Sequence, residues 1–296
     1  MSDWPPIDEP ELLERLALVD REFVEFIETL ASRVPPRSYD EASFARAIGY
    51  PWTRPAGSYL LSGARLELLE ELTAAERGSA IDRHTSAESG RQPLLAIGSN
   101  GAPEALERKF AHFPDEEDRT VLALTGRLHD FDIGVAAQPT LYGSMPATLF
   151  PSPGTAVCAT VLWVTPTQFT QLTWSELSYR LGKLRTRFDV EESATSFEEV
   201  LVFVSRFGAF CVDGKPAALA AIPASNRTAS ALSQERLLDA AAALAIGPEA
   251  KAETLVRAIF EDMAAIGPKF AGTVNRASLP FASEQWTPFS PGRQCE

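Results

Sequence analysis

The spacing of apolar residues predicts helices in the N-terminal quarter of the chain. Between residues 11 and 33, leucine, valine, isoleucine and phenylalanine recur at steps of three and four, so they lie on one face of a helix. A pair of prolines follows and ends this helix. Two shorter helices are expected over residues 40–48, where Asp40 is the N-cap, and over residues 64–75.

The pattern changes to strands after residue 92. Residues 94–97 are all apolar and predict a short buried strand. Residues 156–164 form the clearest strand, and because they are apolar on both faces we expect them in the centre of a sheet. The prolines between residues 142 and 154 confine any strand there to an edge or a short piece, with a turn at Pro153–Gly154. Further strands are expected over 121–128 and 131–137, and a hairpin over 200–222 with a tight turn at Asp213–Gly214.

Helices are also expected between and after these strands. Pro103 suits the first turn of a helix that runs to residue 111. Thr165 and Gln168 form a capping box at the start of a helix over 166–181. Two C-terminal helices, 233–245 and 249–265, each end in Ile-Gly-Pro, and residues 268–296 are predicted to be irregular. The predicted class is therefore α+β.

Residues 75–92 are nearly all small or charged, which is typical of a linker. We therefore divide the chain into a helical region over 1–75, a linker over 76–92 and a main domain over 93–296.

Composition and charge exclude several classes of protein. The chain has 296 residues, of which 45% are hydrophobic, so a core is expected rather than wholesale disorder. A net charge of −13 argues against a general nucleic-acid binder, and no apolar run is long enough to cross a membrane. Three cysteines without metal spacing, and no signal-peptide pattern, favour the cytoplasm. The three histidines are scattered without metal-ligand spacing, and the sequence contains no P-loop or dinucleotide motif.

A strand, a tight polar loop and a helix follow one another at residues 94–111. Gly98, Ser99, Asn100 and Gly101 form the loop, and free backbone N–H groups gather at such a loop and at the helix start. These groups can hold a carboxylate, a phosphate or a developing oxyanion. The alternative interpretation is an ordinary turn. Ser99 lacks the Gly-x-Ser-x-Gly pattern of a hydrolase nucleophile.

Residues 50–59 combine two prolines, a glycine and three large aromatic side chains in an irregular segment. The simpler interpretation, which we favour, is a loop that seals the core. The alternative is a lid or a wall over a pocket.

Glu176 is the most informative residue of the predicted helix 166–181. On a helical wheel it falls between Phe169 and Leu172, in the middle of an apolar stripe. Burial would raise the pKa of such a carboxyl, which suits a general acid or base near neutral pH. The alternative is a structural glutamate bonded to Tyr179 or to a nearby arginine.

Three stretches together resemble the gamma-glutamylcyclotransferase-like superfamily. Residues 96–100 are similar to its Tyr-Gly-Ser-Asn loop, with Ile97 at the tyrosine position. Residues 143–164 are similar to its Gly-x-x-Pro-Ala strand and Pro-Gly turn. Residues 172–179 are similar to its Leu-Asp-x-x-Glu-Gly-x-x-Tyr segment, with Thr173 and Leu177 in place of Asp and Gly, and with one residue fewer between Glu176 and Tyr179.

The resemblance implies a small mixed β-barrel with a helical N-terminal extension and C-terminal helices. It implies a small-molecule gamma-glutamyl substrate, which is converted to 5-oxoproline and a free amine without metal or cofactor. Glu176 would then be the general acid and base, and the substrate would be held by Ile97, Gly98, Ser99, Asn100, Gly101 and Tyr179. Two alternatives stay open: a non-catalytic binding protein on this fold, and an amide hydrolase or acyl transferase that uses the same glutamate. The sequence predicts neither nucleic-acid nor membrane partners and leaves the oligomeric state undetermined.

Overall fold

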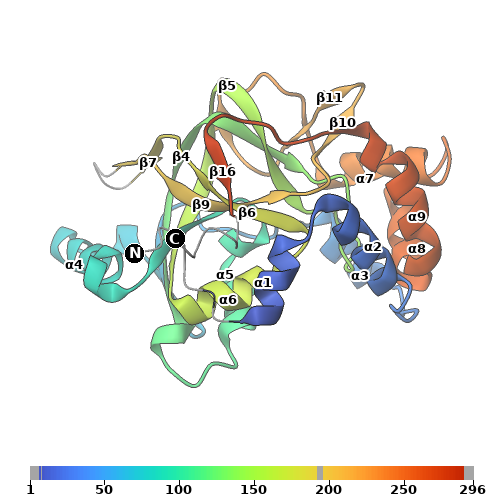
Figure 1. The fold of residues 1–296 in the computed structure, drawn as a ribbon. Coiled ribbons are helices and arrows are strands. Elements are labelled where there is room, and N and C mark those ends of the chain that lie inside the picture. The colour runs from blue at the N-terminus through green and yellow to red at the C-terminus, as the bar shows by residue number, and fades with distance from the viewer. Residues whose placement is uncertain (1–6, 8, 192–195, 290–296) are drawn as a thin grey trace.

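The computed structural model describes residues 7, 9–191 and 196–289 (Figure 1). The N-terminal region holds three helices, α1 (Pro10–Ala17), α2 (Asp20–Ala31) and α3 (Glu41–Ile48). The single helix predicted over 11–33 is thus wrong, because the extended backbone of Leu18 and Val19 separates α1 from α2. The cap of α3 is confirmed, since the Ser43 N–H donates to Asp40 Oδ1 at 2.8 Å.

The helix predicted over residues 64–75 is wrong. Strands β1 (Tyr59–Ser62) and β2 (Arg65–Leu68) form a hairpin there, with Gly63 in the left-handed region at φ 59°, and only the 3₁₀ turn η1 (Leu69–Glu71) is helical. The leucines of this segment fit a strand as well as a helix, because a short apolar window does not distinguish the two periods. β1 also pairs with the main sheet through β4.

A helix occupies most of the segment predicted to be a linker. Helix α4 (Ala74–Thr85) begins at a capping box in which the Thr73 N–H donates to the Glu76 carboxylate at 3.0 Å, and η2 (Ala87–Ser89) follows it. The polar composition of this segment therefore reflects an exposed helix and not an irregular linker. The division of the chain into three parts stays a prediction, although β1 joins the first part to the sheet of the third.

Within the described ranges, the main sheet has thirteen strands and mixes parallel and antiparallel pairs. Its central path runs β14-β12-β4-β5-β3-β9-β6-β16. The pairing among described residues does not join the two ends of this path, so the expected mixture of helices and strands is present but the predicted barrel is not confirmed. The path comprises β14 (Ala231–Leu232), β12 (Ala218–Leu219), β4 (Thr120–Val135), β5 (Ala147–Val164), β3 (Gln92–Ala96), β9 (Val200–Ser205), β6 (Tyr179–Leu184) and β16 (Trp286–Pro288).

Strands β4 and β5 are longer than the sequence pattern predicts. The two strands expected over 121–128 and 131–137 form one continuous strand, β4. The edge position predicted for the strand after residue 142 agrees with the pairing, because residues 147–151 pair with β4 on one side and β3 and β13 pair only with later residues of β5. Phe131 pairs with both Pro151 and Ala156, and the residues between them bulge out of the ladder. A proline in this bulge needs no ladder partner. The central position of residues 156–164 is confirmed, since β5 lies between β4 and β3.

The remaining strands are short. The tight turn at Asp213–Gly214 is confirmed, with φ 52° and 76°, and it joins β10 (Ala209–Val212) to β11 (Lys215–Pro216). β10 also pairs with β15 (Ser278–Leu279) in a second sheet. The main sheet gains β7 (Phe188–Val190), β8 (Ser196–Phe197) and β13 (Ala224–Ser225).

The later helices gather in two groups around the sheet (Figure 1). Helices α7 (Gln234–Ala245), α8 (Ala252–Glu261) and α9 (Met263–Thr273) lie beside α2 and α3, and α5 (Pro103–Phe110) lies against α6 (Pro166–Ser175). The irregular structure predicted from residue 268 is wrong at its start, because α9 continues through Pro268 to Thr273. Short 3₁₀ turns complete the chain: η3 (Ser99–Gly101), η4 (Glu117–Arg119) and η5 (Asn275–Ala277). No helix in the described ranges is long and apolar enough to cross a membrane.

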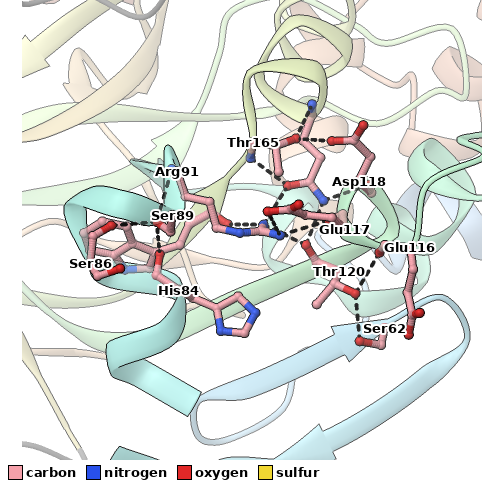
Figure 2. A network of polar contacts seen from close by, with 12 residues as sticks. Ser62, His84, Ser86, Ser89, Arg91, Glu116, Glu117, Asp118, Thr120 and Thr165 are labelled. Carbon is pink, nitrogen blue, oxygen red and sulfur yellow. Dashed lines mark hydrogen bonds and ion pairs between the residues drawn. The ribbon is translucent and has the colours of Figure 1, made fainter. Parts of the chain in front are cut away.

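A buried arginine ties the first central strand to its neighbours (Figure 2). The Arg91 side chain is only 3% exposed and donates to the carbonyl oxygens of Thr120 at 2.8 Å and Glu117 at 2.9 Å. It also reaches the Trp163 carbonyl at 3.2 Å and Gln168 Oε1 at 3.4 Å. One guanidinium thus fixes the starts of β3, β4 and α6 relative to one another.

We expect Arg91→Met to lower the free energy of unfolding by about 2–4 kcal/mol, because several buried acceptors lose their donor. Urea denaturation followed by circular dichroism measures this. The control is Arg21→Met, whose side chain is 88% exposed and whose ion pair with Glu25 lies on the surface. Equal stability of the two variants would contradict a structural role for the Arg91 network.

Candidate functional site

The polar loop after β3 has the predicted order of strand, loop and helix. η3 closes on itself through the Gly101 N–H, which donates to the Gly98 carbonyl at 3.0 Å. The N–H groups of Ser99 and Asn100 have no hydrogen-bond acceptor within the described part of the chain. These two donors, next to the start of α5, are free for a negatively charged atom of a ligand.

Glu176 lies opposite this loop, although its local structure differs from the prediction. Helix α6 ends at Ser175, and Glu176 is its C-cap with φ −115°, so the wheel argument placed the residue in a helix that stops before it. The carboxyl nevertheless lines a cavity. Asn100 Nδ2 donates to Glu176 Oε1 at 2.9 Å, which joins two segments 76 residues apart.

Lys109 completes this cluster, and the sequence analysis missed it. Its Nζ donates to Asn100 Oδ1 at 2.6 Å and to Ser175 Oγ at 2.8 Å, and lies 4.0 Å from Glu176 Oε1. Because Lys109 occupies the amide oxygen of Asn100, the amide nitrogen points at the carboxylate. No spacing rule predicts this contact, which depends on α5 packing against α6.

The environment of the cluster shifts two pKa values. Burial raises the pKa of the Glu176 carboxyl, and the charge of Lys109 and the hydrogen bonds of Asn100 and Ser175 offset part of this. Burial lowers the pKa of the Lys109 ammonium, which Glu176 opposes. The Glu176 side chain keeps 18% of its surface exposed, so a ligand in the cavity can reach it.

Both interpretations of residues 50–59 agree with the structure, because Tyr50 and Tyr59 are buried in the hydrophobic core while part of the segment forms a wall of this cavity. Tyr50 and Trp52 line the cavity. Arg54 donates to the carbonyl oxygens of Ile97, at 3.0 Å, and Gly98, and burial lowers the pKa of its guanidinium. Because Arg54 binds the carbonyl groups of Ile97 and Gly98, the N–H groups of the loop stay available for a ligand.

Tyrosines supply the aromatic surface near Glu176. Tyr179 Oη donates to the Ala147 carbonyl at 2.8 Å, while the Ala147 N–H donates to Tyr50 Oη at 2.8 Å. Tyr142 also lines the cavity, and burial raises the pKa values of all three phenols. Tyr179 was predicted as a site residue, Tyr50 belongs to the segment for which a wall over a pocket was the alternative, and Tyr142 was not predicted.

The structure brings most predicted residues to one cavity of about 650 Å³, a size typical of small-molecule sites. Glu176, Tyr179 and loop residues 97–100 line it. Gly101 does not line the cavity, and its carbonyl instead accepts the Tyr59 hydroxyl at 3.0 Å. The substrate-binding roles of these residues stay predictions.

Two histidines of the described ranges, in which no group of three or more His, Cys, Asp or Glu side chains could hold a metal ion, make contacts with other groups of the protein. His84 is buried with Nδ1 2.8 Å from the Ala80 carbonyl, and His129 contacts Asp189 at 2.9 Å. Both histidines are therefore engaged in structural contacts.

Comparisons with known proteins find partial likeness only. No protein-family model matches the sequence, and no curated protein matches it. Among solved structures, the chain is similar to a gamma-glutamyl cyclotransferase, with 18% identity and a TM-score of 0.31 over 39% of this chain and 66% of that one. It is also similar to the uncharacterized protein loc79017 from Homo sapiens, with 17% identity and a TM-score of 0.28 over 39% of this chain and 67% of that one. The likeness to YkqA from Bacillus subtilis has 15% identity and a TM-score of 0.30 over 54% of this chain and 51% of that one. At these TM-scores the likeness carries no argument, and the proposal below depends on the site.

We expect Lys109→Met to raise the pKa of Glu176 further, because the substitution removes the cation that favours the carboxylate. Carbon-13 NMR titration of glutamate side chains measures this, with Glu176→Gln to assign the signal. Arg108→Met, one residue away, removes a cation that does not act on Glu176 and should leave its titration unchanged. A Glu176 midpoint at the ordinary value of about 4.3 would remove the argument for a buried base.

A substitution at Gly98 tests how closely the Tyr50 side chain approaches the polar loop. A Cβ added at Gly98 would clash with Tyr50 Oη and lie 3.2 Å from Ala147 Cβ. We expect Gly98→Ala to cost about 1–3 kcal/mol of stability, and Tyr50→Phe to relieve part of that cost in the double variant. Denaturation of the two single variants and the double variant gives the coupling. Gly78→Ala in α4, where no atom lies within 4 Å, is the control. Strict additivity would contradict the close approach.

Proposed function

We propose that this protein is a cyclotransferase that converts a gamma-glutamyl amide into 5-oxoproline and a free amine. One observation carries the proposal: a buried carboxyl with a raised pKa, Glu176, shares a cavity with the polar loop and is oriented by the loop's own Asn100. A base near neutral pH and donors for a developing oxyanion are the two groups that this intramolecular acyl transfer needs.

The reaction needs proton transfer at two nitrogen atoms. The α-amine of the substrate attacks its own γ-carbonyl, forming the lactam C–N bond, and the amide C–N bond breaks. Glu176 accepts the proton that the attacking amine loses and donates it to the leaving nitrogen, so the enzyme returns to its starting state. The raised pKa suits both steps, because it makes the carboxylate a stronger base and keeps the carboxyl protonated to a higher pH, where it can act as the acid.

The cavity wall holds the substrate in the conformer that cyclises. The N–H groups of Ser99 and Asn100 are the candidates for binding the carbonyl oxygen as it becomes an oxyanion. The Tyr142 and Tyr179 rings restrict the glutamyl chain, and such restriction is a large part of the advantage of an intramolecular reaction. The chemistry transfers only protons and a carbonyl group, so it calls for no cofactor.

Two other functions fit the same site and differ in their products. A hydrolase or acyl transferase would use Glu176 to activate water or a second amine and would release free glutamate or a new amide. A binding protein would hold the ligand without turnover and would keep its affinity in Glu176→Gln. The buried carboxyl favours catalysis, because removing a carboxylate from water costs free energy, and a catalytic role gives a reason for keeping it in the cavity.

We expect the native protein to release 5-oxoproline from gamma-glutamyl amides, and Glu176→Gln to be slower by about a hundredfold or more, because the amide cannot accept the proton. Chromatographic assay of 5-oxoproline and glutamate together measures this. Glu107→Gln, on the exposed side of α5, is the matched control and should retain full activity. Release of glutamate alone would favour the hydrolase, and no product from any amide would contradict catalysis.

A further inference from the structure

The cavity that contains Glu176 continues well beyond the polar loop. It extends between α2 and α9, which contact each other, and there it is lined by Val24, Ile27 and Ala31 of α2 and by Gly267, Phe270 and Ala271 of α9. We call these six residues the apolar arm. Figure 1 shows α2 beside α9 at one side of the sheet.

Charge divides the cavity into two ends. Its lysine and arginine residues are Lys109 and Arg108, which belong to α5 at the polar end. Among the lining residues that α2 and α9 contribute, none is a cation, and the charged one is Glu28, an exposed glutamate. A carboxylate on a ligand would therefore find partners near Lys109 and none along the apolar arm.

The size of the cavity points the same way. A glutamyl unit is much smaller than the drug-sized ligands that fill cavities of about 300–1,000 Å³, and this cavity is about 650 Å³. When the glutamyl unit lies at the polar end, the space that remains includes the apolar arm. The amine half of the substrate projects from the scissile bond beside Glu176 and has this space to occupy.

We propose that the amine half of the substrate is large, apolar and without a carboxylate, and that it binds in the apolar arm. This inference rests on the proposed cyclotransferase activity and makes it more specific: amides of apolar amines are substrates in preference to gamma-glutamyl amino acids and peptides. Asn275 also lines the cavity, and its buried Oδ1 accepts no hydrogen bond from the described residues.

Three amides test the preference: the gamma-glutamyl derivatives of methylamine, 2-phenylethylamine and phenylalanine. We expect kcat/KM for the phenylethylamide to exceed that for the methylamide at least tenfold, which the burial of about two methylene groups already supplies. The phenylalanine derivative has the same ring with an added carboxylate, and we expect it to be at least tenfold poorer than the phenylethylamide. Equal values for the three substrates would overturn the inference and leave the cyclotransferase standing.

Two glycines of α9 provide a matched pair of variants. A Cβ added at Gly267 would lie 3.8 Å from Ala31 Cβ, in van der Waals contact with the opposite side of the apolar arm, so a leucine there would take up space in the arm. Gly272 does not line the cavity and has no atom within 4 Å of an added Cβ. We expect Gly267→Leu to lower the ratio of phenylethylamide to methylamide activity, and Gly272→Leu to leave it unchanged. An unchanged ratio in Gly267→Leu would overturn the inference.

A binding measurement separates this inference from the proposed function. Glutaryl phenylethylamide lacks the α-amine and cannot cyclise, so calorimetry with it measures binding separately from turnover. Binding that Gly267→Leu weakens, without turnover of any glutamyl amide, would keep the apolar arm and overturn the cyclotransferase. A third outcome is that the analogue does not bind, and that light scattering gives a dimer for the native protein and a monomer for Gly267→Leu. This outcome would show that a second copy of the chain covers the apolar arm and would overturn the inference.

Discussion

The organisation of the site depends on one carboxylate that is buried but not fully neutralised. Glu176 receives a hydrogen bond from Asn100 and lies 4.0 Å from the Lys109 ammonium, too far for a direct hydrogen bond. Lys109 instead binds Asn100 and Ser175, so the cation orients the amide more than it quenches the carboxylate. The end of α6, the loop after β3 and the last turn of α5 are held together by this arrangement. A closer ion pair would have lowered the pKa of Glu176 and weakened it as a base.

The walls of the cavity come from parts of the chain that are far apart in sequence. Arg54 fixes the loop by donating hydrogen bonds to its carbonyl groups. Tyr50 approaches Gly98 so closely that a side chain at position 98 would clash with it. Helix α9 closes the other end against α2. The N-terminal region, which the sequence separated from the main domain by a linker, thus contributes a wall, a sheet strand and one side of the apolar arm.

Local patterns predicted the elements whose signals are local. The caps of α3 and α6, the tight turn at Asp213–Gly214 and the central strand ending at Val164 each follow from a few neighbouring residues. The errors lie where tertiary pairing decides: residues 65–68 form a strand because they pair with β1, and β5 is longer than predicted because it continues past its prolines through a bulge opposite Phe131. Glu176 was found for a partly wrong reason, since its burial comes from the packing of a helix end and not from a helical face. Arg54 and Lys109 could not be predicted, because their contacts depend on packing between distant segments.

Ile97, at the position where the similar loop of the cyclotransferase-like superfamily has a tyrosine, has a structural context that the sequence did not provide. Ile97 is 6% exposed and belongs to the main core, so an apolar side chain suits the position. The aromatic rings and hydroxyls near Glu176 come from Tyr50, Tyr142 and Tyr179. An aromatic wall can therefore be rebuilt from another segment while the loop keeps its glycine, its free N–H groups and its asparagine. On this reasoning the departure at Ile97 does not argue against the proposed activity. It argues for a cavity with a different outline, in which the N-terminal region contributes to the choice of substrate.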